Sequence, residues 1–208
     1  MRKSTKGISI KTKALPIQDV QDYYQNEFYN TLKNNKGYQY ERLTECFLFM
    51  LQSKTGLRIS DVLDLEYSNF KEVGFEIYLE LVLKKTKQQL TLPIDRILFK
   101  MLQDYKQWCL MTFNKVDACV FFNLKTNKKF SYIWCNKRIN ILNSSGALGK
   151  VYENIGTHSI RKGLAEYLYT KKGLRTTQYL LGHKSMQTTE IYLELEKKEH
   201  LKALREVL

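Results

Sequence analysis

The spacing of apolar residues along the first quarter of the chain predicts two amphipathic helices. In segments 16–35 and 39–54 the apolar residues recur every three or four positions, which puts them on one face of a helix. Gly56 is predicted to end the second helix, because glycine adopts the left-handed backbone conformation that ends many helices. A short helix through Val62 and Leu65 should follow. The residues predicted to face the core from the two helices are Ile17, Val20, Tyr24, Phe28, Leu32, Leu43, Phe47, Met50 and Leu51.

The pattern then changes to the alternation that is typical of strands. Residues 75–83 alternate apolar and polar positions, and after the lysine-rich turn 84–88 a second strand is predicted at 89–94. Asp95 is placed to cap a long helix that follows. The strand is predicted to bury Phe75, Ile77, Leu79, Leu81 and Leu83, and the helix Ile97, Met101, Leu102, Tyr105 and Trp108.

The second half of the chain is again mainly helical in pattern. A short apolar piece at 118–122 and a basic loop at 123–129 precede a predicted helix at 130–142, and nearly all of the chain from His158 to Leu208 has a helical pattern. We therefore expect a mainly α fold with a small antiparallel β-sheet, in the α+β class. One compact domain over residues 15–208 should follow a flexible basic arm at residues 1–14.

Charge points to a polyanionic partner. The 208 residues carry 34 Lys and Arg against 21 Asp and Glu, a formal net charge of +13, and such an excess of positive charge suits nucleic acid. The four cysteines form no C-x-x-C pair and no zinc-finger spacing with histidine, so no metal site is expected. Neither a signal peptide nor a membrane span is predicted, which indicates a cytoplasmic protein without membrane contacts.

Four short motifs gather residues that suit phosphate chemistry. Arg58 follows the helix-ending glycine in TGLRISD, His158 and Arg161 share a helix face in THSIR, and LGHKSMQTTEIY contains His183 and Tyr192. A lysine-rich turn, KKTKQ, joins the two predicted strands. Each motif is common in unrelated proteins when it stands alone, so only the presence of all four in this order is specific.

Taken in order, TGLRISD, KKTKQQLTLPI, HSIR and LGHKSMQTTEIY resemble the tyrosine recombinase (phage integrase) family from about residue 16 to the C-terminus. The resemblance implies that family's catalytic-domain fold and a site-specific recombinase that cleaves and rejoins duplex DNA through a 3′-phosphotyrosyl link. It also implies a tetramer on synapsed DNA, no cofactor, no metal and no small-molecule ligand.

The resemblance further implies roles for the cationic residues. Arg58 and Arg161 match the two arginines that bind the scissile phosphate, and a planar guanidinium can bind two phosphate oxygens at once. Lys85 matches the hairpin lysine that protonates the departing 5′ oxygen, with Lys84 and Lys87 as competing assignments.

His158, His183 and Tyr192 complete the implied site. His158 would accept a proton or contact the phosphate, His183 would hydrogen-bond the phosphate, and Tyr192 would be the nucleophile. We expect nearby positive charge to favour the phenolate of Tyr192. Lys184, beside His183, is expected to support DNA binding.

The nine residues from His183 to Tyr192 predict a break in the helix. Along one continuous helix these two side chains would point to opposite faces, since there are 3.6 residues in a turn. Gly182 and a capping Ser185 are placed to supply the break.

The role of Asp61 stays open between two readings. It occupies the acidic position of the family and could orient the arginines or the histidine, or it could be a solvated acid on a helix face. Asp61 and Asp64 share that face, which raises the alternative of a metal-dependent nuclease; no further carboxylates cluster with them.

Three further questions stay open at this point. Type IB topoisomerase chemistry uses nearly the same groups, and 175–192 could instead form a non-catalytic helix-turn-helix DNA reader. Only 57 residues precede Arg58, so the separate DNA-clamping domain of most family members is expected to be missing, and the chain is either a fragment of a longer integrase or a single-domain member. The tail 197–208 has helical apolar spacing and could pack on its own domain or on a neighbouring protomer.

Overall fold

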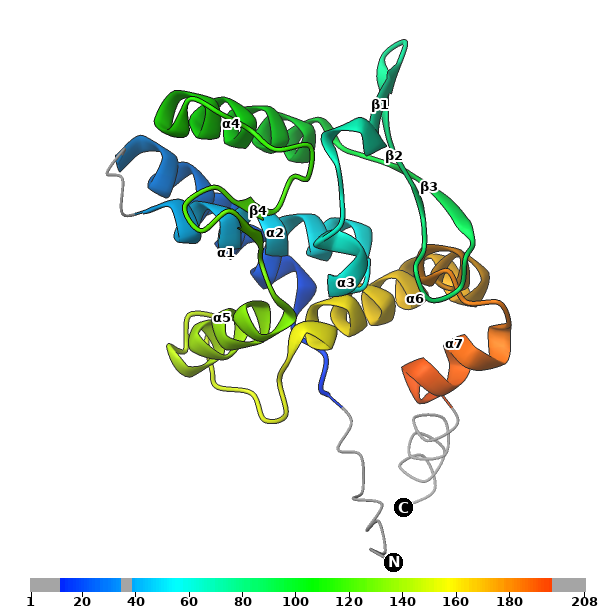
Figure 1. Ribbon diagram of the computed structural model, residues 1–208. Helices are drawn as coiled ribbons and strands as arrows, with labels where there is room; N and C mark the ends of the chain where they lie inside the picture. Colours follow the sequence, from blue (N-terminus) through cyan, green and yellow to red (C-terminus); the bar gives the residue numbers. More distant parts are fainter. Residues whose placement is uncertain (1–11, 35–38, 196–208) are drawn as a thin grey trace, which may run out of the picture.

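A computed structural model describes residues 12–34 and 39–195 of the chain. Helices α1 (Ile17–Asn34) and α2 (Tyr40–Thr55) confirm the first two predictions. α2 is buried on nearly every face and contacts α1, α4 (Arg96–Phe113) and α6 (Thr157–Leu181). Because these neighbours cover it on several sides, α2 forms the middle of the core (Figure 1).

The predicted hairpin is present and gains a third strand. β2 (Glu76–Val82) pairs with β3 (Gln89–Pro93), and β1 (Phe70–Val73) adds to β2, giving an antiparallel sheet in the order β1-β2-β3. β1 was not predicted, because three of its four side chains are exposed and it lacks the alternation that reveals a half-buried strand. Phe75 lies in the turn between β1 and β2 and is 93% exposed, so its predicted burial was wrong.

The middle helices begin where capping side chains place them. Asp95 Oδ1 accepts a hydrogen bond from the Leu98 amide at 2.7 Å and caps α4, as predicted. Most of the predicted α4 face is buried, whereas Ile97 is 46% exposed. Ser131 caps α5 (Tyr132–Ser144), so that helix starts at Tyr132 and not at residue 130.

Short elements connect these helices. α3 (Ile59–Val62) ends before Leu65, earlier than expected, and a 3₁₀ turn (Tyr67–Asn69) leads into the sheet. β4 (Phe122–Asn123) and β5 (Lys128–Lys129) form a small second hairpin in the segment predicted as a basic loop.

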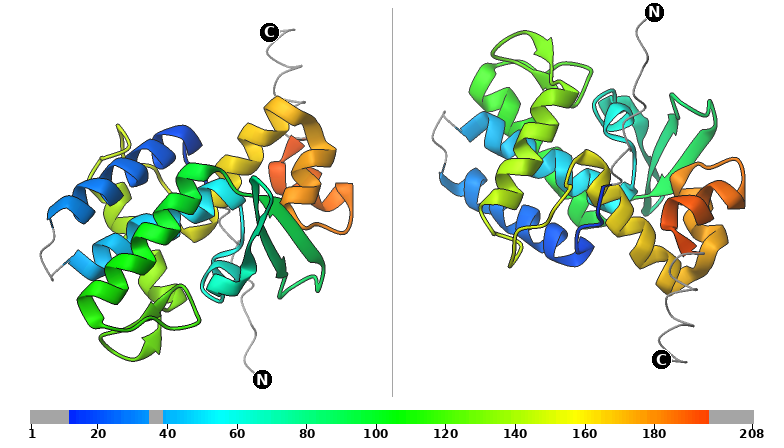
Figure 2. Two further views of the ribbon diagram at one scale, coloured as in Figure 1. Left: turned by 90° about the horizontal axis from the view of Figure 1, so that it is seen from above. Right: turned by 90° about the horizontal axis from the view of Figure 1, so that it is seen from below.

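The C-terminal helices bring the sheet and the helical core together. α6 changes direction at Gly173, where φ is +78°, and α7 (Met186–Leu193) follows after a turn. The turn between β2 and β3 lies beside the α6–α7 junction (Figures 1 and 2). Gly163 of α6 packs against the backbone of Leu15, whose amide donates to the Ser159 carbonyl at 3.1 Å.

Some expectations fall outside the described residues. Most of the predicted basic arm and the apolar tail 197–208 cannot be compared with the structure for this reason. Within the described ranges, no helix is long and apolar enough to cross a membrane.

Candidate active site

The six residues predicted to carry the chemistry line one open cleft of about 440 Å³. They come from four places in the chain: the start of α3, the β2–β3 turn, the first turns of α6, and the α6–α7 junction with α7. None of the described residues that line the cleft is acidic. The lining residues are Arg58, Lys85, Thr86, His158, Arg161, His183, Lys184, Thr188, Ile191 and Tyr192.

Arg161 is the most deeply buried charge of the site, at 2% exposed. Its Nη1 donates to the Gly56 carbonyl at 2.5 Å, and its Nη2 donates to the Leu181 carbonyl at 2.7 Å. Burial lowers the pKa of Arg161 to about 10, which leaves it charged at neutral pH. A guanidinium has five N–H donors, so Arg161 holds two turns in place and keeps donors for a ligand.

Arg58 is positioned by the turn at which α2 ends. Gly56 ends α2 with φ +64°, and Arg58 is the extended residue just before α3. Its Nη1 is buried and makes no hydrogen bond among the described residues. An unpartnered buried donor is costly, and the Arg58 side chain lines a cleft that is also lined by Arg161 and Lys85.

Tyr192 reaches the cleft from α7 because the helix breaks as predicted. Gly182 ends α6 with φ +58°, and the Ser185 side chain caps α7 by accepting from the Thr188 amide at 3.3 Å. The rings of His183 and Tyr192 then lie edge to face with centroids 5.6 Å apart. The break therefore puts the histidine and the tyrosine side by side.

The Tyr192 phenol is buried and makes no hydrogen bond of regular geometry among the described residues. Burial raises its pKa above the ordinary value of 10, although the charges of Arg161 and Arg58 act to lower it. The predicted effect of the cations is thus present, but burial outweighs it. The phenol is therefore protonated at neutral pH in this structure.

The two histidines are neutral at pH 7. Burial, followed by the charges of Arg161, Arg58 and Lys85, lowers the pKa of His183 to about 4. The same causes lower the pKa of His158, which is more exposed. Each imidazole can therefore donate one N–H and accept at the other nitrogen. A phosphate in the cleft would offset the positive charge, which is the lesser of the two causes.

The hairpin lysines take different directions. Lys85 lines the cleft, whereas the Lys84 ammonium pairs with Asp64 and Lys87 occupies a left-handed turn position outside the cleft lining. Lys184 is exposed at the rim, next to His183. Of the three lysines in the turn, the geometry favours Lys85 for chemistry in the cleft.

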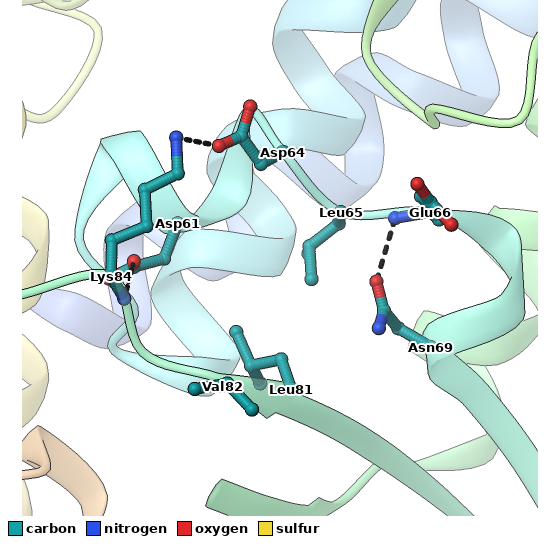
Figure 3. A pocket seen from close by; sticks show the side chains of 8 residues that line it. All are labelled: Asp61, Asp64, Leu65, Glu66, Asn69, Leu81, Val82 and Lys84. Atoms are coloured by element: carbon teal, nitrogen blue, oxygen red, sulfur yellow. Dashed lines mark hydrogen bonds and ion pairs between the residues drawn. The ribbon is translucent and has the colours of Figure 1, made fainter. Parts of the chain in front are cut away.

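Asp61 and Asp64 both hold Lys84, at the start of the turn between β2 and β3 (Figure 3). Asp61 is 3% exposed, and its Oδ1 accepts from the Lys84 amide at 3.0 Å. Asp64 contacts both Lys84 and Lys129, the latter at 2.8 Å. The reading of Asp61 as a solvated acid is wrong, and among the described residues no group of three or more metal-binding side chains is placed to hold an ion.

Sequence reasoning missed the residues that support the site. Thr189 is fully buried and its Oγ1 lies 3.0 Å from His183 Nδ1. Lys162, next to Arg161, pairs with Glu194 at the end of α7 at 2.8 Å. The sequence signal for the Thr189 contact is its spacing from Tyr192: the two residues share a face of α7, so Thr189 lies near the same cleft.

Sequence comparison with known proteins matches this chain to tyrosine recombinases and integrases. The sequence profile of the phage integrase family matches residues 22–199. The chain is 30% identical over 153 residues to the tyrosine recombinase XerC of Pediococcus pentosaceus, a match that covers 70% of this chain and 48% of XerC. It is 28% identical over 181 residues to the probable integrase/recombinase YoeC of Bacillus subtilis, covering 86% of each.

Solved structures share the fold. The site-specific recombinase XerH bound to difH substrate superposes with a TM-score of 0.68 at 19% identity, over 89% of this chain and 52% of XerH. A lambda integrase dimer bound to a COC′ core site gives 0.59 at 17% identity, over 89% of this chain and 49% of that protein. The chain thus spans about half the length of XerC, XerH and lambda integrase. With a profile match over most of its length and this fold, the chain belongs to the phage integrase family of tyrosine recombinases and has that family's catalytic-domain fold.

Proposed function

We propose that this protein is a site-specific DNA recombinase that cleaves and rejoins duplex DNA through a covalent link to Tyr192. The main support is the cleft itself, in which Arg58, Lys85 and Arg161 surround a phenol without an acidic residue among the described lining. Such a cleft has an excess of positive charge that an anionic phosphodiester would neutralise.

In the proposed cleavage step the Tyr192 oxygen attacks phosphorus and the bond from phosphorus to the 5′ oxygen breaks. The phenolic proton passes to a neighbouring base, for which His158 is the candidate in the cleft, and Lys85 gives a proton to the departing oxygen. Arg58, Arg161 and His183 donate to the nonbridging oxygens, on which negative charge grows. Attack by a 5′ hydroxyl then reverses these steps and restores the phosphodiester.

The partner proposed from this chemistry is double-stranded DNA. The net charge of +13 and the exposed lysines Lys184 and Lys87 suit the DNA backbone. Strand exchange between two duplexes needs several protomers, and we propose a tetramer on synapsed DNA, in the cytoplasm where such DNA is found. The XerH and lambda integrase structures contain DNA, the latter with a protein dimer.

The test is covalent capture of DNA. The protein is incubated with a pool of nicked duplexes that carry a randomised central region, denatured in SDS, and the attached DNA is sequenced. We expect an SDS-resistant adduct on a recurring sequence, with the nucleotide attached to the peptide that contains Tyr192. Tyr192→Phe should give no adduct.

Tyr179→Phe is the matched control. Tyr179 lies outside the cleft, is 58% exposed, and donates to the Thr91 carbonyl at 3.1 Å, so its loss should leave the adduct intact. Binding of the pool without an adduct would instead identify a non-catalytic DNA-binding protein. Sequence-independent relaxation of a supercoiled plasmid would identify topoisomerase activity.

A further inference from the structure

His183 is held by two different elements. Its backbone is held by the end of α6, since the His183 amide donates to the Gln178 carbonyl at 3.2 Å and the Gln178 side chain donates to the His183 carbonyl at 3.0 Å. Its ring is held by α7, through Thr189 at Nδ1 and through the edge-to-face contact with Tyr192. The helix that carries the nucleophile therefore also sets the orientation of the imidazole.

The Thr189 hydroxyl differs from three threonine hydroxyls of α6. Those of Thr170, Thr176 and Thr177 donate to the backbone carbonyl four residues earlier. Within the described residues, the hydroxyl of Thr189 has His183 Nδ1 as its partner. Thr189 is 0% exposed, so its hydrogen has this nitrogen as its acceptor or has none.

This contact decides which nitrogen of His183 carries the proton. An unpaired buried hydroxyl hydrogen is costly, which favours donation from Thr189 to Nδ1 and leaves the ring hydrogen of His183 on Nε2. The nearby guanidinium groups of Arg58 and Arg161 oppose this, because they favour a lone pair on Nε2. A bound phosphate reverses that opposition, since an anionic oxygen needs a donor and not a second lone pair.

We propose that Thr189 is a positioning residue that donates to His183 Nδ1 and thereby presents Nε2–H to the cleft. This inference rests on the proposed function for its consequence, but the tautomer itself is a property of the protein without DNA. Because Thr189 and Tyr192 are one helical turn apart on α7, seating the nucleophile and selecting the competent tautomer are a single event. Displacement of α7 would remove both.

The tautomer can be read directly by nuclear magnetic resonance. The chain has 3 histidines, so the ring nitrogens of ¹⁵N-histidine-labelled protein at pH 7 are assigned with His183→Gln and His158→Gln variants. We expect a protonated Nε2 and an unprotonated, hydrogen-bonded Nδ1 for His183. Thr189→Val, which keeps the shape of the side chain, should shift the ring toward the other tautomer, and Thr189→Ser should restore the original spectrum.

The second measurement is the rate of adduct formation on the selected DNA. Thr189→Val should slow it by about 10-fold at saturating DNA, in proportion to the lost fraction of competent tautomer, with unchanged DNA affinity, and Thr189→Ser should recover most of the rate. A protonated Nδ1 in the wild-type protein, or a Thr189→Val rate defect without a tautomer change, would overturn the proposal. Absence of any wild-type adduct would refute the proposed function and leave the tautomer result intact.

Discussion

Acid should lower the free energy of unfolding of this protein, and His183 should account for a measurable part of the loss. The pKa of His183 is about 4 in the folded protein against 6.5 for an unperturbed imidazole, because the ring is buried beside Arg161, Arg58 and Lys85. Between these two values the unfolded chain binds more protons than the folded one, so the free energy of unfolding falls as the pH falls through this window. Above pH 6.5 the imidazole is neutral in both states, so this part of the free energy of unfolding is fully retained.

The size of the effect follows from the two pKa values. Between pH 7 and pH 5 a group with these constants loses about 2 kcal/mol of the free energy of unfolding. His183→Gln keeps a polar side chain without a titrating nitrogen. From pH 7 to pH 5 the variant should therefore lose about 2 kcal/mol less of its free energy of unfolding than the wild-type protein loses. His183 is 9% exposed, so screening by solvent reduces this figure little.

The measurement is urea unfolding at pH 7 and pH 5, followed by tryptophan fluorescence, because Trp108 is buried in the core and Trp134 packs against it. His158→Gln is the control for the more exposed histidine of the same cleft. If wild type and His183→Gln lost equal stability between the two pH values, His183 would not be held neutral by its surroundings. The description of His183 as an imidazole buried beside three cations would then be wrong.

Three further substitutions test separate parts of the structure. Gly163→Ala would place a methyl group 2.1 Å from the Leu15 carbonyl oxygen and should cost about 1–3 kcal/mol of stability in urea unfolding; an unchanged midpoint would refute this close approach. Glu45→Gln removes the 1% exposed partner of Arg42 and Arg138 and should cost about 2–3 kcal/mol, less than for a fully buried pair because both arginines are partly exposed; a loss below 0.5 kcal/mol would contradict it. Lys85→Ala should slow adduct formation about 10²-fold or more with a normal 5′ oxygen and much less with a 5′ sulfur, which leaves without a proton; equal defects on both substrates would exclude Lys85 as the acid.

Local patterns predicted the helices and the break that brings His183 and Tyr192 together. The signals were strong because apolar spacing, Gly182 and Ser185 act within a few residues of one another. The family motifs likewise named the residues that line the cleft, because each motif is short and continuous.

Contacts between distant segments could not be read in the same way. Asp61 binds a backbone amide 23 residues away, which leaves no side-chain pattern in the sequence. Strand β1 is recognisable only once β2 is there to pair with it. The raised pKa of Tyr192 depends on how deeply α7 packs, and a list of nearby cations alone indicates the opposite direction.

The two hydrogen bonds from Arg161 to backbone carbonyls connect separate parts of the site. One guanidinium ties the turn that presents Arg58 to the turn that presents His183, through Gly56 and Leu181. Lysine cannot reproduce both contacts, because it carries its charge on one atom in place of a planar fork. Replacement of Arg161 therefore loosens both Arg58 and His183, so the resulting loss of activity cannot be divided between a lost phosphate contact and two displaced side chains.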